Sequence, residues 1–238
     1  MIPLKDDVPS GAVPFVTIMV IALNVLVYAY QFSLGLESDR GSSGAFEAFV
    51  HEFGAIPCRL TGTCTVAGQF PSPVVTVFTS MFLHGSVLHL AGNMLYLWIF
   101  GDNVEDTLGH ARFVVFYLLS GVGAALAQTL VSPTSTVPMI GASGAISGVL
   151  GAYLVLFPYA TILTLVMFGF FIRFIHIPAI VVLGFWIVLQ FLYGTLTFSA
   201  SAMGRSDQGG VAWFAHIGGF VAGILLLFLI RPRRSARL

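Results

Sequence analysis

Two polar side chains stand at the start of apolar segments of this chain. Ser143 lies in the run Gly141-Ala142-Ser143-Gly144, and His216 follows Ala215 at the start of a later apolar stretch. Burying a hydroxyl or an imidazole in an apolar medium costs free energy unless it has a hydrogen-bond partner. We therefore expect Ser143 and His216 to be partners, as nucleophile and general base. Taken alone, Ser143 also fits a simpler interpretation, the N-cap of a packed helix.

An earlier apolar segment carries another pair of polar groups. His89 and Asn93 are one helical turn apart, so they share a face of a helix. Both side chains donate hydrogen bonds of the kind that stabilises an oxyanion. His84 falls on the opposite side of an ideal helix from Asn93, so it should not join Asn93 unless the helix starts after His84. We expect His84 to be structural and to hold the first loop.

The composition is that of a membrane protein. Of 238 residues, 57% are hydrophobic and 8% are charged, whereas soluble domains carry about 25% charged residues. We predict an all-α polytopic membrane protein with the lipid bilayer as its solvent. With net charge zero and no basic cluster among aromatic residues, the chain is not expected to bind nucleic acid. The predicted spans are 12–31, 77–100, 111–131, 142–158, 178–197 and 213–230.

The six spans define a membrane domain over 12–230, with an N-terminal tail at 1–11, a large loop at 32–76 and a basic tail at 231–238. Between the fourth and fifth spans, the segment 159–177 contains an apolar run broken by Arg173 and His176. The run is short for a span, so we expect an interfacial or re-entrant piece. A seventh span at this place is the alternative.

Lys and Arg side chains predict the orientation in the membrane. With six spans, both termini are expected to be cytoplasmic, in the plasma membrane of a prokaryote. The basic residues then expected inside are Lys5, Arg112, Arg173, Arg231, Arg233, Arg234 and Arg237; those outside are Arg40, Arg59 and Arg205. In this orientation the polar groups of the second, fourth and sixth spans meet in a recess that is open to the outside.

Metal chemistry is not expected, and neither is a cofactor. The spacing of His84 and His89 differs from the H-E-x-x-H pattern of zinc peptidases. The outer halves of the spans contain no acidic residue, so we expect a Ser-His dyad without a third acidic group. In the first outside loop, Cys58 and Cys64 are close enough in sequence for a disulfide. Two reduced thiols are the alternative.

At this point the residues resemble the rhomboid family of intramembrane serine proteases. The motifs that carry the resemblance are His84-x-x-x-x-His89-x-x-x-Asn93, Gly101-x-x-x-Glu105-x-x-x-Gly109, Gly141-x-Ser143-Gly144 and Ala215-His216-x-x-Gly219. The resemblance implies a six-helix rhomboid bundle in which Ser143 attacks and His216 acts as base. It also implies an oxyanion hole made by Asn93, His89 and the Ser143 backbone N–H. The implied substrates are single-pass transmembrane proteins, cut within or beside their membrane segments.

Two positions depart from the family pattern. Ser147 stands where many members have an aromatic residue that packs on the catalytic histidine, and the first loop lacks the Trp-Arg pair of many members. A catalytically inactive relative that binds transmembrane helices is the main rival, although such proteins usually lack the serine or the histidine. A small transporter is a second rival, and its matched broken helices and midplane charges are missing from this sequence.

Overall fold

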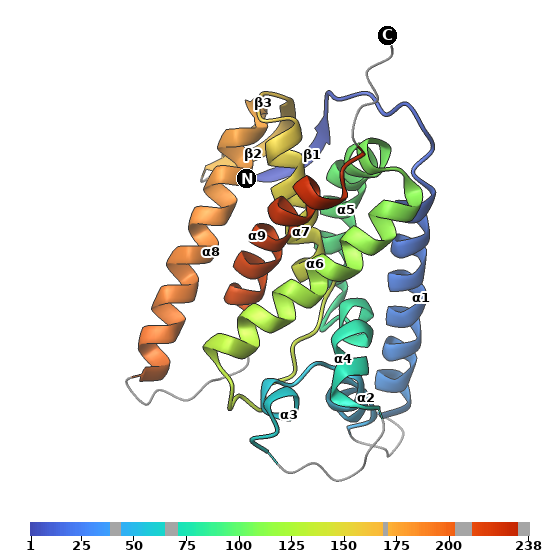
Figure 1. The fold of residues 1–238 in the computed structure, drawn as a ribbon, viewed down its shortest axis with the longest axis vertical. Helices are drawn as coiled ribbons and strands as arrows, with labels where there is room; N and C mark the ends of the chain where they lie inside the picture. Colours follow the sequence, from blue (N-terminus) through green and yellow to red (C-terminus); the bar gives the residue numbers. More distant parts are fainter. Residues whose placement is uncertain (39–43, 65–70, 169–170, 203–210, 233–238) are drawn as a thin grey trace.

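The computed structural model describes residues 1–38, 44–64, 71–168, 171–202 and 211–232. Within these ranges, four helices are long and apolar enough to span a membrane, and a bent pair of helices adds a fifth span if it is counted as one. The four are α1 (Phe15–Ser38), α6 (His110–Val131), α8 (Ala179–Ala202) and α9 (Trp213–Ile230). The chain is therefore a multi-pass membrane protein with a mainly helical bundle (Figure 1).

A shorter helix, α7 (Ser143–Leu156), lies inside the bundle and packs against α5 (Val87–Leu108), α6 and α9. Its 14 residues reach only about 21 Å at 1.5 Å per residue. Nearly all of its middle is buried, and the ring of Tyr153 meets that of Phe100 at a centroid distance of 4.9 Å. Because α7 is short and enclosed, its N-terminus lies within the bundle and not at its surface.

The second predicted span, 77–100, is wrong as a single helix. The structure has α4 (Pro73–Thr79) and the 3-10 turn η1 (Ser80–Phe82), and then α5 after a bend of 83°. The helix restarts at Val87 because the Ser86 side chain caps it, accepting a hydrogen bond from the backbone N of His89 at 3.1 Å. His84 therefore precedes α5 and is not carried on its far side.

The segment 159–177, expected to be an interfacial or re-entrant piece, does not form a seventh span. It forms a hairpin of β2 (Thr161–Phe168) and β3 (Phe171–Pro178), and β1 (Ile2–Asp6) completes an antiparallel sheet in the order β1-β2-β3. β-branched and aromatic residues recur in both hairpin strands, and they favour extended structure. The prediction of an all-α protein is corrected accordingly, since residues expected to form a tail supply β1.

Carboxylates join the sheet to the helices. Tyr153 Oη donates a hydrogen bond to Asp6 Oδ2 at 2.6 Å, and burial raises the pKa of the Asp6 carboxyl above its ordinary value. Asp7 accepts hydrogen bonds from both the backbone N and the hydroxyl of Thr161, and these bonds lower its pKa. The N-terminal strand is thus held to the bundle through side chains as well as through the ladder.

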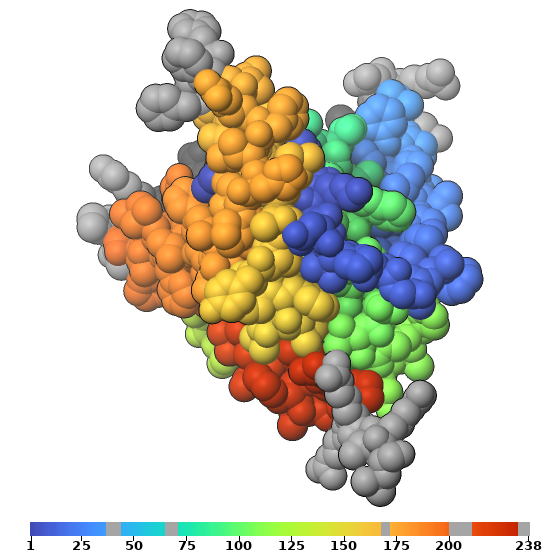
Figure 2. Space-filling view, turned by 90° about the horizontal axis from the view of Figure 1, so that it is seen from above, coloured from blue at the N-terminus to red at the C-terminus, as the bar shows by residue number. Residues whose placement is uncertain are grey.

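The sheet marks one end of the bundle, together with the start of α6 and the end of α9 (Figure 1). Seen from above, the N-terminal residues lie beside the hairpin on this end (Figure 2). The elements at this end carry Lys5, Arg112, Arg173 and Arg231, whereas Arg59 belongs to α3 (Pro57–Thr61) at the opposite end. The other basic residues used to predict orientation (Arg40, Arg205, Arg233, Arg234 and Arg237) lie outside the described residues.

Glu105 fastens α1 to α5. Its buried carboxylate accepts hydrogen bonds from Val16 N at 2.9 Å, Thr17 N at 2.8 Å and Thr17 Oγ1 at 2.7 Å. A fourth contact, at 2.6 Å, comes from His110 Nδ1 at the start of α6. Helix N-termini expose unpaired N–H groups and the positive end of the helix dipole, so a carboxylate is well placed there. One side chain therefore joins three helices.

Replacing Glu105 by Ala should destabilise the bundle, because two helix N–H groups lose their acceptor inside the protein. We expect the free energy of unfolding to fall by at least about 2 kcal/mol. Asp106→Asn is the control, since exposed Asp106 accepts one bond from Gly11 N. Unfolding of detergent-solubilised protein, followed by tryptophan fluorescence, measures both variants. Equal stability of the two variants would contradict this role of Glu105.

Candidate active site

Two helices that carry expected site residues are in backbone contact. A Cβ atom built on Gly219 of α9 would overlap the backbone O of Gly144 in α7, and one on Gly223 would overlap Gly148. Small residues at helix interfaces permit such close approach in membranes. The contact begins in the first turn of α7 and in the second turn of α9, so it brings together the side chains that precede it on the two helices.

Ser143 and His216 meet at this junction. Ser143 Oγ lies 2.8 Å from His216 Nε2, and both residues are partly buried. The other ring nitrogen, Nδ1, lies 2.8 Å from Oε1 of Gln190, a buried residue of α8. Gln190 was not predicted from the sequence, because only an acidic residue was expected as a third group. The signal was a lone amide within an apolar helix.

His84 lies between α1 and Asn93, and its expected role in holding the first loop stays a prediction. Asn93 Nδ2 lies 2.9 Å from His84 Nε2, and the His84 backbone exchanges hydrogen bonds with the Gln31 side chain of α1. The ring of Tyr28, also in α1, meets the His84 ring edge-on. The late start of α5 allows this arrangement. His84 therefore connects α1 to the amide of Asn93.

His89 and Asn93 both border Gly141, two residues before Ser143. A Cβ built on Gly141 would lie 2.8 Å from His89 Nε2 and 3.5 Å from Asn93 Nδ2. The backbone at Gly141 has φ +118°, a conformation that side chains rarely adopt. Glycine therefore leaves the space beside Ser143 open to two side-chain nitrogens. Gly85 N donates to His89 Nδ1 at 3.4 Å, which leaves Nε2–H as the donor toward this space.

A cavity of about 1280 Å³ contains these groups. Its lining includes Ser143, His216, His89 and Asn93, and it extends to Glu47 and His51 of α2 (Ala45–Phe53). α2 lies at the end of the bundle opposite the sheet (Figure 1). Within the described ranges, no three His, Cys, Asp or Glu side chains come together in a way that would hold a metal ion.

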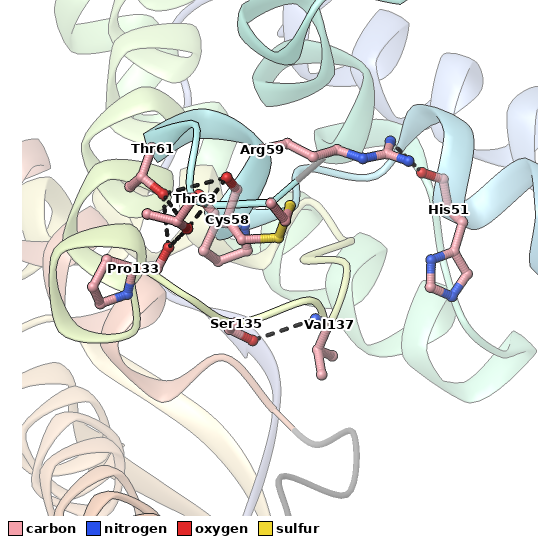
Figure 3. The surroundings of a disulfide bond; sticks show 10 residues. His51, Cys58, Arg59, Thr61, Thr63, Pro133, Ser135 and Val137 are labelled. Carbon is pink, nitrogen blue, oxygen red and sulfur yellow. Dashed lines mark hydrogen bonds between the residues drawn. A yellow bond between two sulfur atoms is a disulfide. The ribbon is translucent and has the colours of Figure 1, made fainter. Parts of the chain in front are cut away.

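The first loop supports the segment that leads to Ser143 (Figure 3). Cys58 and Cys64 form a disulfide, and Thr61 Oγ1 donates to Pro133 O at 2.8 Å. Cys58 N donates to Ser135 O at 3.0 Å, and residues 55 and 139 form an antiparallel bridge. These contacts attach the loop without the Trp-Arg pair that many family members have.

The Gly101-x-x-x-Glu105-x-x-x-Gly109 motif lies away from Ser143. A Cβ on Gly101 would press on Thr17 of α1, and Gly109, with φ +79°, makes the turn between α5 and α6. This motif therefore builds the junction of three helices, whereas the other motifs converge on the cavity. The structure brings together Ser143, His216, Asn93, His89, His84, Gly141, Gly144 and Gly219.

A family model described as the Rhomboid domain matches residues 71–233, which is most of the chain. The chain belongs to the rhomboid family. RHOMBOID-like protein 1 of Arabidopsis thaliana is 34% identical over 159 residues, which are 66% of this chain and 35% of that protein. Rhomboid protease GluP of Bacillus subtilis (strain 168) is 35% identical over 147 residues, 62% of this chain and 24% of that protein.

Rhomboid protein 1, mitochondrial, of Saccharomyces cerevisiae is 32% identical over 155 residues, 63% of this chain and 40% of that protein. This rhomboid chain thus spans less than half the length of these relatives. The family includes proteases, as the name of GluP states. Because relatives are named mitochondrial and chloroplastic as well as bacterial, the comparisons do not support the expectation of a prokaryotic plasma membrane.

Proposed function

We propose that this rhomboid is an intramembrane serine endopeptidase that cleaves single-pass transmembrane proteins within or beside their membrane segments. The observation that carries the proposal is the 2.8 Å contact between Ser143 Oγ and His216 Nε2 inside the cavity. His216 accepts the Ser143 proton, and the alkoxide attacks a peptide carbonyl carbon. His216 then protonates the leaving amine, and water hydrolyses the acyl-enzyme. No cofactor is needed for these steps.

An oxyanion hole beside Ser143 is part of the proposal. Asn93 Nδ2 carries two hydrogens, and the bond to His84 uses one of them, which leaves the other for the oxyanion. His89 Nε2–H lies on the same side of Gly141. The Ser143 backbone N–H, at the first turn of α7, is the third donor. These donors would stabilise the negative charge that develops on the substrate carbonyl oxygen.

The depth of Ser143 favours a membrane-embedded substrate. Ser143 begins α7, whose opposite end adjoins the sheet, so its hydroxyl lies about 20 Å from that end. With the sheet end at one surface of a hydrocarbon core about 30 Å thick, Ser143 would lie below the other surface. Trp186 and Phe198 of α8 and Trp213 of α9 add apolar lining to the cavity. An inactive helix-binding rhomboid would have no use for the aligned Ser143 and His216.

Ser143→Ala and His216→Ala should each abolish cleavage of a model transmembrane substrate, because the nucleophile or its base is removed. Residual cleavage below about one hundredth of wild type is expected. Ser120→Ala is the control, since the buried Ser120 hydroxyl has no partner among the described residues. Purified variants reconstituted in liposomes measure the rate. Ser143→Ala cleaving above that level would refute the proposed nucleophile.

Asn93→Ala should lower kcat more than it raises KM, since an oxyanion donor acts chiefly in the transition state. We expect a loss of about 10–10³-fold in kcat. Asn24→Ala is a matched control, because the Asn24 amide bonds only Val20 O of its own helix α1 among the described residues. Steady-state kinetics on the same substrate separate the constants. A change confined to KM would assign Asn93 to substrate docking instead.

Both termini are proposed to be cytoplasmic. The elements at the sheet end carry Lys5, Arg112, Arg173 and Arg231, and basic residues favour the inner side. The cavity then opens on the outside, where a Cys58–Cys64 disulfide is also favoured.

Thiol labelling tests this orientation after Cys58 and Cys64 are changed to Ser. Thr134→Cys, exposed beside the cavity, should react with a membrane-impermeant maleimide in intact cells. Tyr159→Cys, exposed before β2, should react only once the cells are opened. The background without cysteine is the control. The reverse pattern, or reaction of both sites from outside, would refute the orientation.

A further inference from the structure

Helix α8 brings an amide to the far side of the His216 ring. Gln190 is 6% exposed, and its Oε1 lies 2.8 Å from His216 Nδ1. The same amide contacts its own helix, because Gln190 Nε2 donates to Trp186 O at 3.1 Å. Both ends of the Gln190 amide are therefore engaged, and a flipped amide would place its oxygen against the Trp186 carbonyl oxygen, two acceptors face to face.

The orientation of the amide determines the tautomer of the imidazole. A backbone carbonyl only accepts, so the group that faces Trp186 O is the NH₂ and the group that faces His216 is the carbonyl oxygen. His216 must then carry its hydrogen on Nδ1. A neutral imidazole has one N–H, so Nε2 presents its lone pair to the Ser143 hydroxyl. This is the tautomer that a general base requires.

On α7, Ser143 contacts Nε2 of the imidazole, and no residue of this helix bonds Nδ1. Ser147, one turn after Ser143, donates its hydroxyl to the Ser143 backbone O at 2.6 Å and so turns back on its own helix. The rings that contact His216 are Trp186 of α8, at a centroid distance of 5.9 Å, and Trp213 of α9, at 6.3 Å. The support of His216 therefore comes from α8 and α9.

We propose that Gln190 is a positioning residue, which holds His216 as the Nδ1–H tautomer and keeps its ring aligned with Ser143. Its effect on catalysis rests on the proposed function, whereas the tautomer is a property of the resting protein. When His216 takes up the Ser143 proton, the Gln190 carbonyl dipole faces the new charge. An amide adds no net charge, so its contribution is smaller than that of the aspartate in a serine-protease triad.

The first test reads the tautomer directly. Protein labelled with ¹⁵N in histidine is compared in detergent as wild type, Gln190→Met and Thr195→Val, with the His216 signals assigned by their loss in His216→Ala. Thr195 is an exposed residue of α8 whose hydroxyl bonds carbonyls of its own helix. We expect the Nδ1–H form in wild type and Thr195→Val, and its loss in Gln190→Met. An Nε2–H form in wild type, or an unchanged Nδ1–H form in Gln190→Met, would overturn the proposal.

The second test measures catalysis with the same variants and Gln190→Glu. In Gln190→Met, kcat for a transmembrane substrate should fall about tenfold or more, short of the roughly 10⁴-fold loss known for a triad aspartate. KM should stay within about twofold, because Gln190 is not expected to bind substrate. Gln190→Glu retains an acceptor oxygen and should recover much of the lost kcat. Labelling of Ser143 by a fluorophosphonate should follow the same order.

The outcomes separate the two proposals. A wild-type protein that neither cleaves nor labels at Ser143 would refute the proposed function, while the tautomer result would still decide the role of Gln190. An active wild type with Gln190→Met equally active would refute only the positioning role. A fall in kcat that Gln190→Glu shares in full would assign Gln190 to packing and overturn the proposal. Thermal unfolding of each variant accompanies the kinetics.

Discussion

The close contact between α7 and α9 is the constraint on which the candidate site depends. Gly219 and Gly223 of α9 meet the backbone of Gly144 and Gly148 in α7, and any larger side chain would push the helices apart. The hydrogen bond between Ser143 and His216 tolerates little displacement, because such bonds weaken steeply with distance and angle. In a bilayer the lipid is as apolar as the helix faces, so close packing of small residues supplies the association that water would otherwise drive.

Around this contact, several polar side chains are paired between helices. Glu105 of α5 accepts from the first turn of α1, His84 joins Gln31 of α1 to Asn93 of α5, and Gln190 of α8 meets His216 of α9. An unpaired polar group in an apolar interior is costly. Each pair therefore favours one arrangement of two helices, and together the pairs specify a bundle whose apolar faces alone would fit in several ways.

Much of this arrangement can be predicted from the sequence, and there are physical reasons why the rest cannot. The long helices are visible because apolar length is a local property. The pairing of Ser143 with His216 was predicted from the cost of burying each alone. The break before α5 was not predicted because Ser86 acts as a cap only if the chain has already turned at Gly85. The hydropathy of the sequence is continuous across that turn and does not reveal it. His84 was expected apart from Asn93 for the same reason, because a continuous helix would carry the two on opposite sides.

The β2–β3 hairpin and the contact of Gln190 with His216 were not predicted for a different reason. Both depend on partners that are distant in the sequence. The strands β2 and β3 form a sheet with β1, which lies far away in the sequence, near the N-terminus. The partner of Gln190, His216, is supplied by α9 and not by α8 itself. In an apolar helix, however, a single amide must find a partner or lose free energy. A lone Gln, Asn or His in a predicted membrane span is therefore a candidate hydrogen-bond partner for every other such residue at the same depth, whether or not an acidic residue is present.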